Sequence, residues 1–274
     1  MTDLNSLLNA ASKLKSTDRM PALFLGHGNP MNVITDNEFK VKWQEVGRNL
    51  PRPAAIAVVS AHWLTDGTAV TINPQPKTIH DFYGFPEELY KQIYPAPGAA
   101  DYANLTIENV KSVSIAAASD WGLDHGAWTV LVHLFPKADI PVYQISIDYH
   151  KHPEYHYNLA KELSFLREKG VMVIASGNLV HNLRMVNWSE NPEPYPWALE
   201  FDEFVKNSLM NNDSTALVEY KSRGRLADMA HPTNDHYLPL IYAQGVRSEK
   251  DELAFFTDVI DMGSVSMRSF ILCG

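Results

Sequence analysis

The sequence has almost no cysteine. Cys273 is the single cysteine among 274 residues, and it lies next to the C-terminus. A disulfide framework is therefore excluded, because a disulfide needs two thiols, and a zinc site built from cysteine ligands is not expected. Such sparse cysteine usage is typical of a reducing compartment, and we expect a cytoplasmic protein.

Signals for membranes and nucleic acids are also missing. The first residues lack the basic start and apolar core of a signal peptide, and no apolar run is long enough to cross a bilayer. Lys and Arg number 23 against 32 Asp and Glu, which gives a formal net charge of −9. This excess of negative charge argues against nucleic acid and against an anionic membrane surface as partners.

Nucleotide-binding fingerprints are absent too. The stretch GHGNPMN at 26–32 is rich in glycine, but it has neither the dinucleotide-binding pattern nor the P-loop pattern. Its glycines would allow the backbone to come close to another group beside His27.

What the sequence does have is enough apolar material for a large core. Hydrophobic residues make up 45% of the chain and aromatic residues 11%. Short apolar runs alternate with amphipathic stretches, which predicts one three-layer α/β/α domain with a mostly parallel or mixed central sheet. We place this domain at 21–274, after an N-terminal helix or tether at 1–20. Two predicted strands at 252–259 and 264–272 would finish the sheet edge.

Three of the predicted buried strands lead into a histidine. The strand at 22–25 is followed by His27, the strand at 54–61 by His62, and the strand at 171–175 by His181. Ligands of open α/β sheets bind at the carboxyl ends of the strands, so these imidazoles are expected in one crevice. His236 is predicted in the first turn of a helix capped by Thr233 or Asn234, at the same crevice.

The histidine pattern leaves two interpretations open. Imidazole is a common ligand of zinc and iron, and three neutral nitrogen ligands leave coordination positions open for a substrate. A histidine at a strand end is also often merely structural, and spacing alone weighs the two interpretations evenly. The denser group of His150, His152 and His156 lies in a polar turn, where we expect a solvated surface.

An aromatic and proline-rich segment separates the second strand from the next helix. It spans 65–98 and contains HDFYGFP at 80–86 and YPAPG at 94–98. Its composition is too apolar for a solvated linker. It is predicted either to fold over the pocket as a rigid loop or to form an Ω-loop filled by its own aromatic side chains.

Seven ordered motifs resemble those of one enzyme family. They are FLGHGNPM (24–31), VSAHW (59–63), HDFYGFP (80–86), YPAPG (94–98), WGLDHGAW (121–128), SGNLVHNLR (176–184) and DHYLP (235–239). Together they resemble the class III extradiol ring-cleaving dioxygenases of the LigB superfamily, and within it the DOPA 4,5-dioxygenase (extradiol) family. The resemblance extends from about residue 20 to the C-terminus.

The resemblance implies a mononuclear non-haem Fe(II) site at the carboxyl ends of the strands. His27 and His62 match the first two ligands, and His236 matches the third, where many class III enzymes have a glutamate. His181 matches a histidine that acts as a general base or as a fourth ligand. His125 matches a second catalytic histidine that is expected to contact substrate or oxygen. Three neutral ligands would also accept Zn(II), which cannot change oxidation state.

The family further implies a catechol-type substrate and O2, with a muconic semialdehyde-type product. Four residues are expected to contact the substrate, namely His80, Phe82, Arg184 and Tyr237. Of these, Arg184 or His80 would meet a substrate carboxylate, although a structural role for Arg184 is an equal alternative. We expect a monomer or a homodimer.

Two other functions compete with this one. A zinc-dependent hydrolase could use the same histidines to activate water, with Asp120, Asp124 or Asp235 as the general base. A binding protein could keep the fold and the pocket without catalysis.

Overall fold

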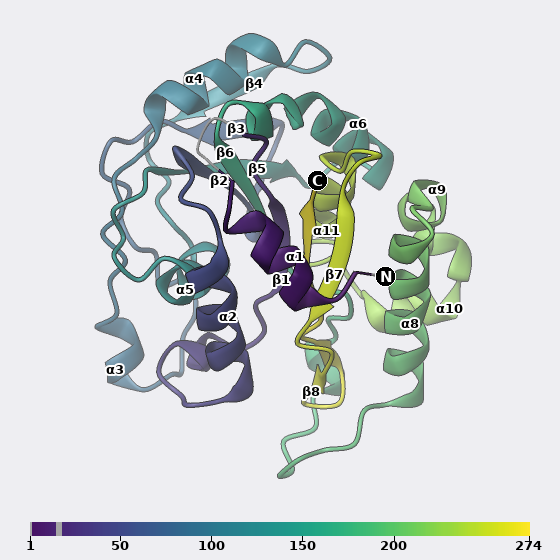
Figure 1. The fold of residues 1–274 in the computed structure, drawn as a ribbon. Coiled ribbons are helices and arrows are strands. Elements are labelled where there is room, and N and C mark those ends of the chain that lie inside the picture. Colours follow the sequence, from purple (N-terminus) through teal and green to yellow (C-terminus); the bar gives the residue numbers. More distant parts are fainter. Residues whose placement is uncertain (1, 15–17) are drawn as a thin grey trace.

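The computed structural model describes residues 2–14 and 18–274 and is built around an eight-stranded mixed sheet (Figure 1). The strand order is β4-β3-β5-β2-β6-β1-β10-β7. Neighbouring strands β5, β2, β6 and β1 pair in parallel, whereas β10 and β7 run antiparallel at one edge. At the other edge β3 runs antiparallel to β5, and β4 runs parallel to β3.

All but two of the strands belong to this sheet; β8 and β9 form a separate pair. The strands are β1 (Ala22–Gly26), β2 (Ala55–Thr65), β3 (Thr68–Thr71), β4 (Ile115–Ala118), β5 (Val142–Asp148), β6 (Val171–Gly177), β7 (Glu252–Phe256), β8 (Ile260–Asp261), β9 (Val265–Ser266) and β10 (Ser269–Cys273).

The α-helices of the described residues connect and cover these strands. They are α1 (Leu4–Ala11), α2 (Glu38–Asn49), α3 (Glu87–Tyr90), α4 (Ala100–Asn109), α5 (His125–Leu134), α6 (Pro153–Leu163), α7 (Phe165–Glu168), α8 (Pro196–Met210), α9 (Ser214–Val218), α10 (Arg225–Ala230) and α11 (Leu238–Gly245).

The core has two halves, one on each face of the sheet. Alternate residues of one strand belong to different halves: Leu23 packs with α2 and α5, whereas Phe24 packs with α6 and α11. This alternation follows from the two-residue period of a strand. Helices α2 and α5 lie on one side of the sheet in Figure 1, and α6 and α11 lie on the other. The predicted three-layer α/β/α architecture is therefore confirmed, with a mixed sheet.

Helix α5 is held firmly against α2 and the sheet. Its N-cap is Asp124, whose side chain accepts a hydrogen bond from the N–H of Ala127. Gly47 of α2 allows the close approach at the other end, because a Cβ there would lie 2.3 Å from the carbonyl oxygen of Leu134. This packing fixes the position of the first residue of α5, His125.

Residues 4–11 form a helix, which is one of the two forms, helix or tether, predicted for the segment 1–20. Helix α1 buries Leu7, Leu8 and Ala11 and packs against α2 and β7. The rest of the prediction for 1–20 falls partly on residues 1 and 15–17, which lie outside the described residues. The C-terminal prediction holds in outline, since β7 forms the sheet edge and β10 is its neighbour.

Several local predictions were wrong. Strand β2 continues through His62 to Thr65, with a register shift between Val59 and Leu64, so His62 lies inside the strand. Helix α11 begins at Leu238, so His236 precedes it and is not in its first turn. His156, predicted on a solvated surface, is fully buried, and its Nδ1 lies 3.0 Å from the hydroxyl oxygen of Tyr242.

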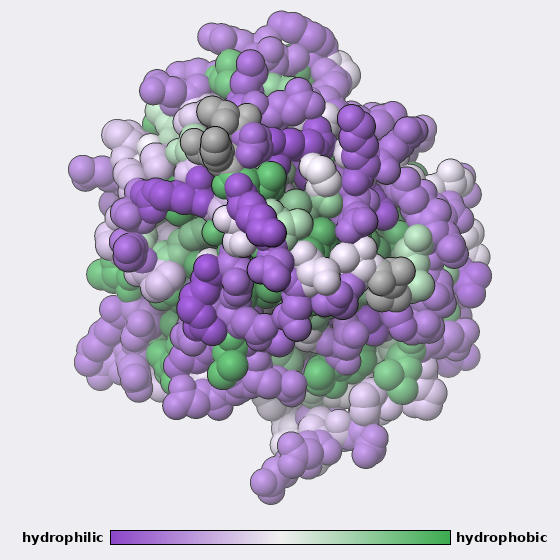
Figure 2. Space-filling view, viewed as in Figure 1, coloured by the Kyte–Doolittle hydropathy of each residue, from purple (hydrophilic) through white to green (hydrophobic). Residues whose placement is uncertain are grey.

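The surface is polar over most of the face in view, with scattered apolar residues (Figure 2). In the part of the chain that the structure describes, no helix is long and apolar enough to cross a membrane.

Burial of His156 predicts a pH-dependent stability. Burial lowers the pKa of His156 from 6.5 to about 4. The unfolded chain therefore takes up a proton as the pH falls below 6.5, whereas the folded chain does not until about pH 4, and stability is lost between these values. At pH 5 the loss from this residue is about 2 kcal/mol.

Urea unfolding of the metal-free protein at pH 7 and pH 5 measures this loss. We expect His156→Gln to reduce the loss by about 2 kcal/mol, because glutamine does not titrate. The control is His152→Gln at the exposed N-cap of the same helix, α6, which should leave the loss unchanged. If the free energy of unfolding falls equally between pH 7 and pH 5 in the His156 variant and the wild type, His156 is not the cause of the loss.

Candidate metal centre and active site

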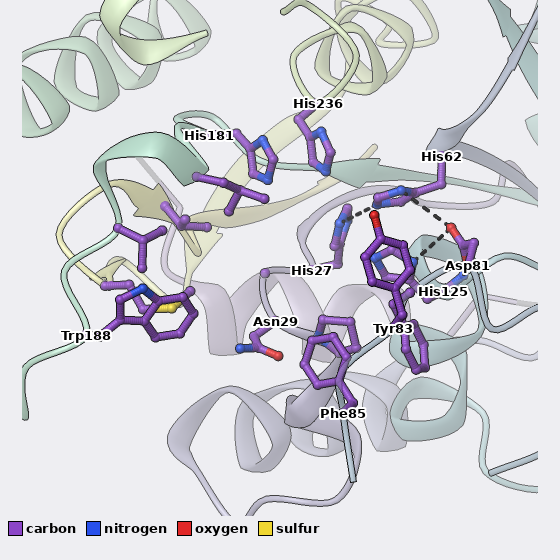
Figure 3. A pocket seen from close by; sticks show the side chains of 17 residues that line it. His27, Asn29, His62, Asp81, Tyr83, Phe85, His125, His181, Trp188 and His236 are labelled. Carbon is purple, nitrogen blue, oxygen red and sulfur yellow. Dashed lines mark hydrogen bonds and ion pairs between the residues drawn. The ribbon is translucent and has the colours of Figure 1, made fainter. Parts of the chain in front are cut away.

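A cavity of about 380 Å³ opens beside the carboxyl ends of β1, β2 and β6 (Figure 3). Residues Gly26 of β1 and Gly177 of β6 are paired in register, as are Ser60 of β2 and Ser176 of β6. Strands β1 and β6 end at this point, whereas β2 continues past it and carries His62. The cavity is lined by five histidines that come from separate parts of the sequence, and these are His27, His62, His125, His181 and His236.

Three of these imidazoles face one another. The Nε2 atoms of His27 and His62 are 3.1 Å apart, and one nitrogen from each of His27, His62 and His236 lies within 4.8 Å of the others. In Figure 3 the three rings converge on one point of the cavity. These are three of the four metal ligands that the family resemblance implies, the fourth being His181 in its alternative role, and the arrangement of the three could hold one metal ion.

Neighbouring groups orient the three rings. The Nδ1 of His27 lies 3.0 Å from the Oγ of Ser176, so its Nε2 is directed into the cavity. The Nδ1 of His236 lies against the carboxylate of Asp235. Gly177 lets strand β6 pass close to His236, because a Cβ at Gly177 would lie 2.3 Å from the carbonyl oxygen of His236. Such partners fix the ring orientation and tautomer of a metal-binding histidine.

Asp81 connects His125 with His62. Its Oδ2 lies 2.9 Å from the Nδ1 of His125 and 3.5 Å from the Nδ1 of His62. Its Oδ1 accepts a 2.8 Å hydrogen bond from the main-chain N–H of His125. Asp81 belongs to the aromatic loop, so this carboxylate ties the loop to the start of α5 (Figure 3).

His181 stacks on His236. The two rings are nearly parallel, with centroids 3.5 Å apart. The main-chain N–H of His181 donates to the carbonyl oxygen of Ala230, which holds the residue beside the loop before α11. His181 can therefore reach either a metal ion or a substrate in the cavity, and both predicted roles are sterically open to it.

Burial keeps these imidazoles neutral. It lowers the pKa of His27 and of His236 well below 6.5, and neighbouring histidines lower it further. Burial, with repulsion from the neighbouring His125, lowers the pKa of His62 to about 3, and burial lowers the pKa of His181 to about 4. A neutral imidazole is the form that binds a metal.

The donor set therefore fits a transition-metal ion. Three neutral nitrogens point at one position, and they leave room for further ligands on the cavity side. Imidazole nitrogens suit zinc and iron, and the described cavity wall offers neither a thiol nor a thiolate.

Of the four predicted substrate-binding residues, one lines the cavity and three do not. Phe82 lines the cavity with Tyr83 and Phe85, so the aromatic loop does fold over it. His80 lies behind this wall, where its Nε2 is 3.0 Å from the carbonyl oxygen of Gln92. Arg184 is exposed and does not line the cavity.

Tyr237 corrects a further expectation. Its side chain is fully buried, and its hydroxyl donates to the carbonyl oxygen of Leu217, away from the cavity. A substrate in the cavity would not touch it. The residue lies next to His236 in the chain, but at that point the backbone turns into α11 and the neighbouring side chains diverge.

Several cavity residues were missed from the sequence, and Asp81 and Trp188 are two of them. Asp81 was noted only as part of a motif, although a carboxylate between two histidine-bearing segments could have drawn attention. Trp188 lines the cavity from the loop that precedes α8. Its role depends on how that loop folds back, and the local sequence carries no signal for this.

The carboxylates proposed for a hydrolase are poorly placed. Asp120 is exposed and outside the cavity lining. Asp124 is buried, caps α5 and accepts a 2.5 Å hydrogen bond from the hydroxyl of Ser60. Asp235 faces the Nδ1 of His236. None of the three offers a carboxylate to a water molecule inside the cavity.

Comparison with known proteins agrees with the geometry. A family model described as the catalytic LigB subunit of aromatic ring-opening dioxygenase matches residues 21–263. A protein of Escherichia coli (strain K12) named 4,5-DOPA dioxygenase extradiol is 46% identical over 260 residues, which cover 93% of this chain and 96% of that protein. A protein of Beta vulgaris with the same name is 35% identical over 260 residues, covering 90% and 94%.

A solved structure shares the fold. The crystal structure of an uncharacterized protein from Escherichia coli K12 superposes with a TM-score of 0.82 at 42% identity, covering 93% of this chain and 100% of that one. Fold, histidine site and relatives together define an extradiol ring-cleaving dioxygenase. The chain belongs to the LigB family of aromatic ring-opening dioxygenases.

The contacts of Asp81 predict a positioning role. Asp81→Asn keeps the shape of the side chain but removes the negative charge beside His125 and His62. We expect kcat/KM for catechol to fall about 10- to 100-fold, the usual cost of losing a carboxylate that orients site histidines. Oxygen uptake measures the rate, and thermal unfolding checks that the fold is kept. Asp120→Asn is the matched control, and equal rates in the two variants would contradict the role.

Proposed function

We propose that this protein cleaves a catechol-type ring in the extradiol position with a mononuclear Fe(II), in the manner of a DOPA 4,5-dioxygenase. The observation that carries the proposal is the convergence of three neutral imidazoles beside an aromatic-walled cavity with two further histidines. The names of the relatives support DOPA or a similar catechol as the substrate.

Metal binding in this proposal uses His27, His62 and His236. Their neutral nitrogens would hold Fe(II), and the cavity beside them would receive the catechol and O2. Bound iron would supply the electron transfer between catechol and O2, which amino acid side chains do not provide. Zinc could occupy the same nitrogens but does not change oxidation state.

The protein's own residues position the substrate and handle its protons. Phe82, Tyr83 and Phe85 would wall one side of the flat ring and exclude water from it. The ring of His181 lines the cavity beside His236, where it could accept a proton from a catechol hydroxyl. His181 serves as the base if three histidines hold the metal, and as a ligand if four do.

His125 would act at a second position. Asp81 lies against its Nδ1, which leaves its Nε2 free to exchange a proton with the bound reactants. The overall reaction inserts both atoms of O2 beside the diol and opens the ring to a muconic semialdehyde-type product. A cytoplasmic location and a monomeric or homodimeric state stay predictions from the sequence.

Metal binding can be tested without turnover. We expect the metal-free protein to bind one Zn²⁺ per chain in isothermal titration calorimetry, and His62→Ala or His236→Ala to weaken binding by at least about 10-fold. His80→Gln is the control, because His80 lies behind the cavity wall and should leave the affinity unchanged. Unaltered affinity in both alanine variants would place the metal elsewhere.

Activity should depend on the identity of the metal. We expect the protein reloaded anaerobically with Fe(II) to consume O2 when DOPA is added and to form a yellow product, and the zinc-loaded protein to consume none. An oxygen electrode with simultaneous absorbance scans makes the measurement, and metal analysis confirms loading. No uptake by the iron-loaded protein across DOPA, catechol and protocatechuate would overturn the proposed function.

A further inference from the structure

The active-site cavity is polar at one end and apolar at the other. Five imidazoles and the carboxylate of Asp81 lie at the metal end. The opposite wall is mostly apolar and carries no charged side chain; Figure 3 shows Trp188 there, across the cavity from the histidines, with the uncharged amide of Asn29 beside it. Among the described residues that line this cavity, none is a lysine or an arginine. A ring held by its two oxygens at the histidine end would therefore direct its substituent toward a wall without positive charge.

The rim of the cavity is formed by exposed apolar side chains. Tyr83 is 91% exposed, Trp188 80% and Leu183 62%, although all three line the cavity. They therefore meet the substituent where it emerges from the site. Aromatic faces attract cations, whereas a carboxylate placed there loses solvation and gains no partner.

A negatively charged groove continues beyond the rim. Trp188 and Met262 line both the cavity and a second groove of about 680 Å³. Five carboxylates border this groove, from Glu38, Glu193, Asp202, Asp258 and Asp261.

The arginine that borders this groove already forms ion pairs. Among the described residues that border the groove, Arg268 is the one lysine or arginine, and it pairs with Asp202 at 2.8 Å and with Asp258 at 2.7 Å. A substituent that extends past Trp188 thus meets surplus negative charge, and the net charge of −9 over the whole chain acts in the same direction.

We propose that this enzyme selects its catechol by the charge of the ring substituent. Catechols with an ammonium or an uncharged apolar substituent bind in preference to those with a carboxylate. This inference rests on the proposed function, because it takes the ring to be held at the histidines. DOPA carries both an ammonium and a carboxylate and falls between the two classes.

The test compares three catechols with the same ring and a two-carbon spacer or tail. Dopamine carries an ammonium, 4-ethylcatechol is uncharged, and 3-(3,4-dihydroxyphenyl)propionate carries a carboxylate. Dissociation constants are measured anaerobically with the zinc-loaded protein at pH 7, from quenching of tryptophan fluorescence. We expect the propionate to bind about 10-fold more weakly than dopamine, with a smaller difference at high salt.

A rim variant makes the test specific. Leu183→Lys adds a cation at an exposed position. It should lower the ratio of the propionate dissociation constant to the dopamine dissociation constant about fivefold. Leu183→Gln adds no charge and should leave the ratio unchanged. Arg184→Gln should also leave it unchanged, because Arg184 lies outside the cavity lining.

The outcomes separate this inference from the proposed function. Three outcomes would overturn the inference. The propionate could bind as tightly as dopamine, or none of the three catechols could bind. The third outcome is an equal ratio of the propionate and dopamine dissociation constants in Leu183→Lys and Leu183→Gln. If the iron-loaded enzyme consumes no O2 with any of the three catechols, the proposed function fails, while the order of dissociation constants still decides the selectivity.

Discussion

The parallel pairing of β1, β6 and β2 is the constraint on which the rest of the structure depends. It sets Gly26 beside Gly177 and Ser60 beside Ser176, so β1 and β6 end next to the part of β2 that carries His62. A parallel sheet brings its carboxyl ends to one edge, and side chains just beyond them must share a small volume. His27, His62 and the loop that carries His236 meet there for this reason.

Gathering imidazoles in a buried space has an electrostatic consequence. Charged rings at such short separations would repel one another and lose hydration, so the site keeps them neutral. The surrounding hydrogen bonds then determine which nitrogen faces inward, with Ser176 oriented on His27 and Asp81 on His125. Because the rings are neutral, their nitrogens can bind a metal ion. Metal binding would in turn stabilise the folded arrangement of these closely packed rings.

The two ends of the cavity divide the work of a ring-cleaving dioxygenase. In the proposed function the histidine end would hold the metal, the diol and the protons, and its residues come from separate segments that meet at the sheet edge. The aromatic loop and the segment that carries Trp188 form the other end, which faces the variable part of a substrate. Selectivity can thus change in the loops while the chemistry stays on the rigid strands.

The layered α/β architecture and the three apolar strands could be predicted from the sequence, because periodicity is a local property; the end of β2 was misplaced, since that strand continues through His62. The family motifs added the ligand set His27, His62 and His236, which the structure brings together. Tertiary structure alone decided that Asp81 lies against His125, that Trp188 lines the cavity, and that Tyr237 and His156 are buried elsewhere. Those outcomes depend on how loops fold back and which helix faces pack together, and both are set by contacts between residues far apart in the chain.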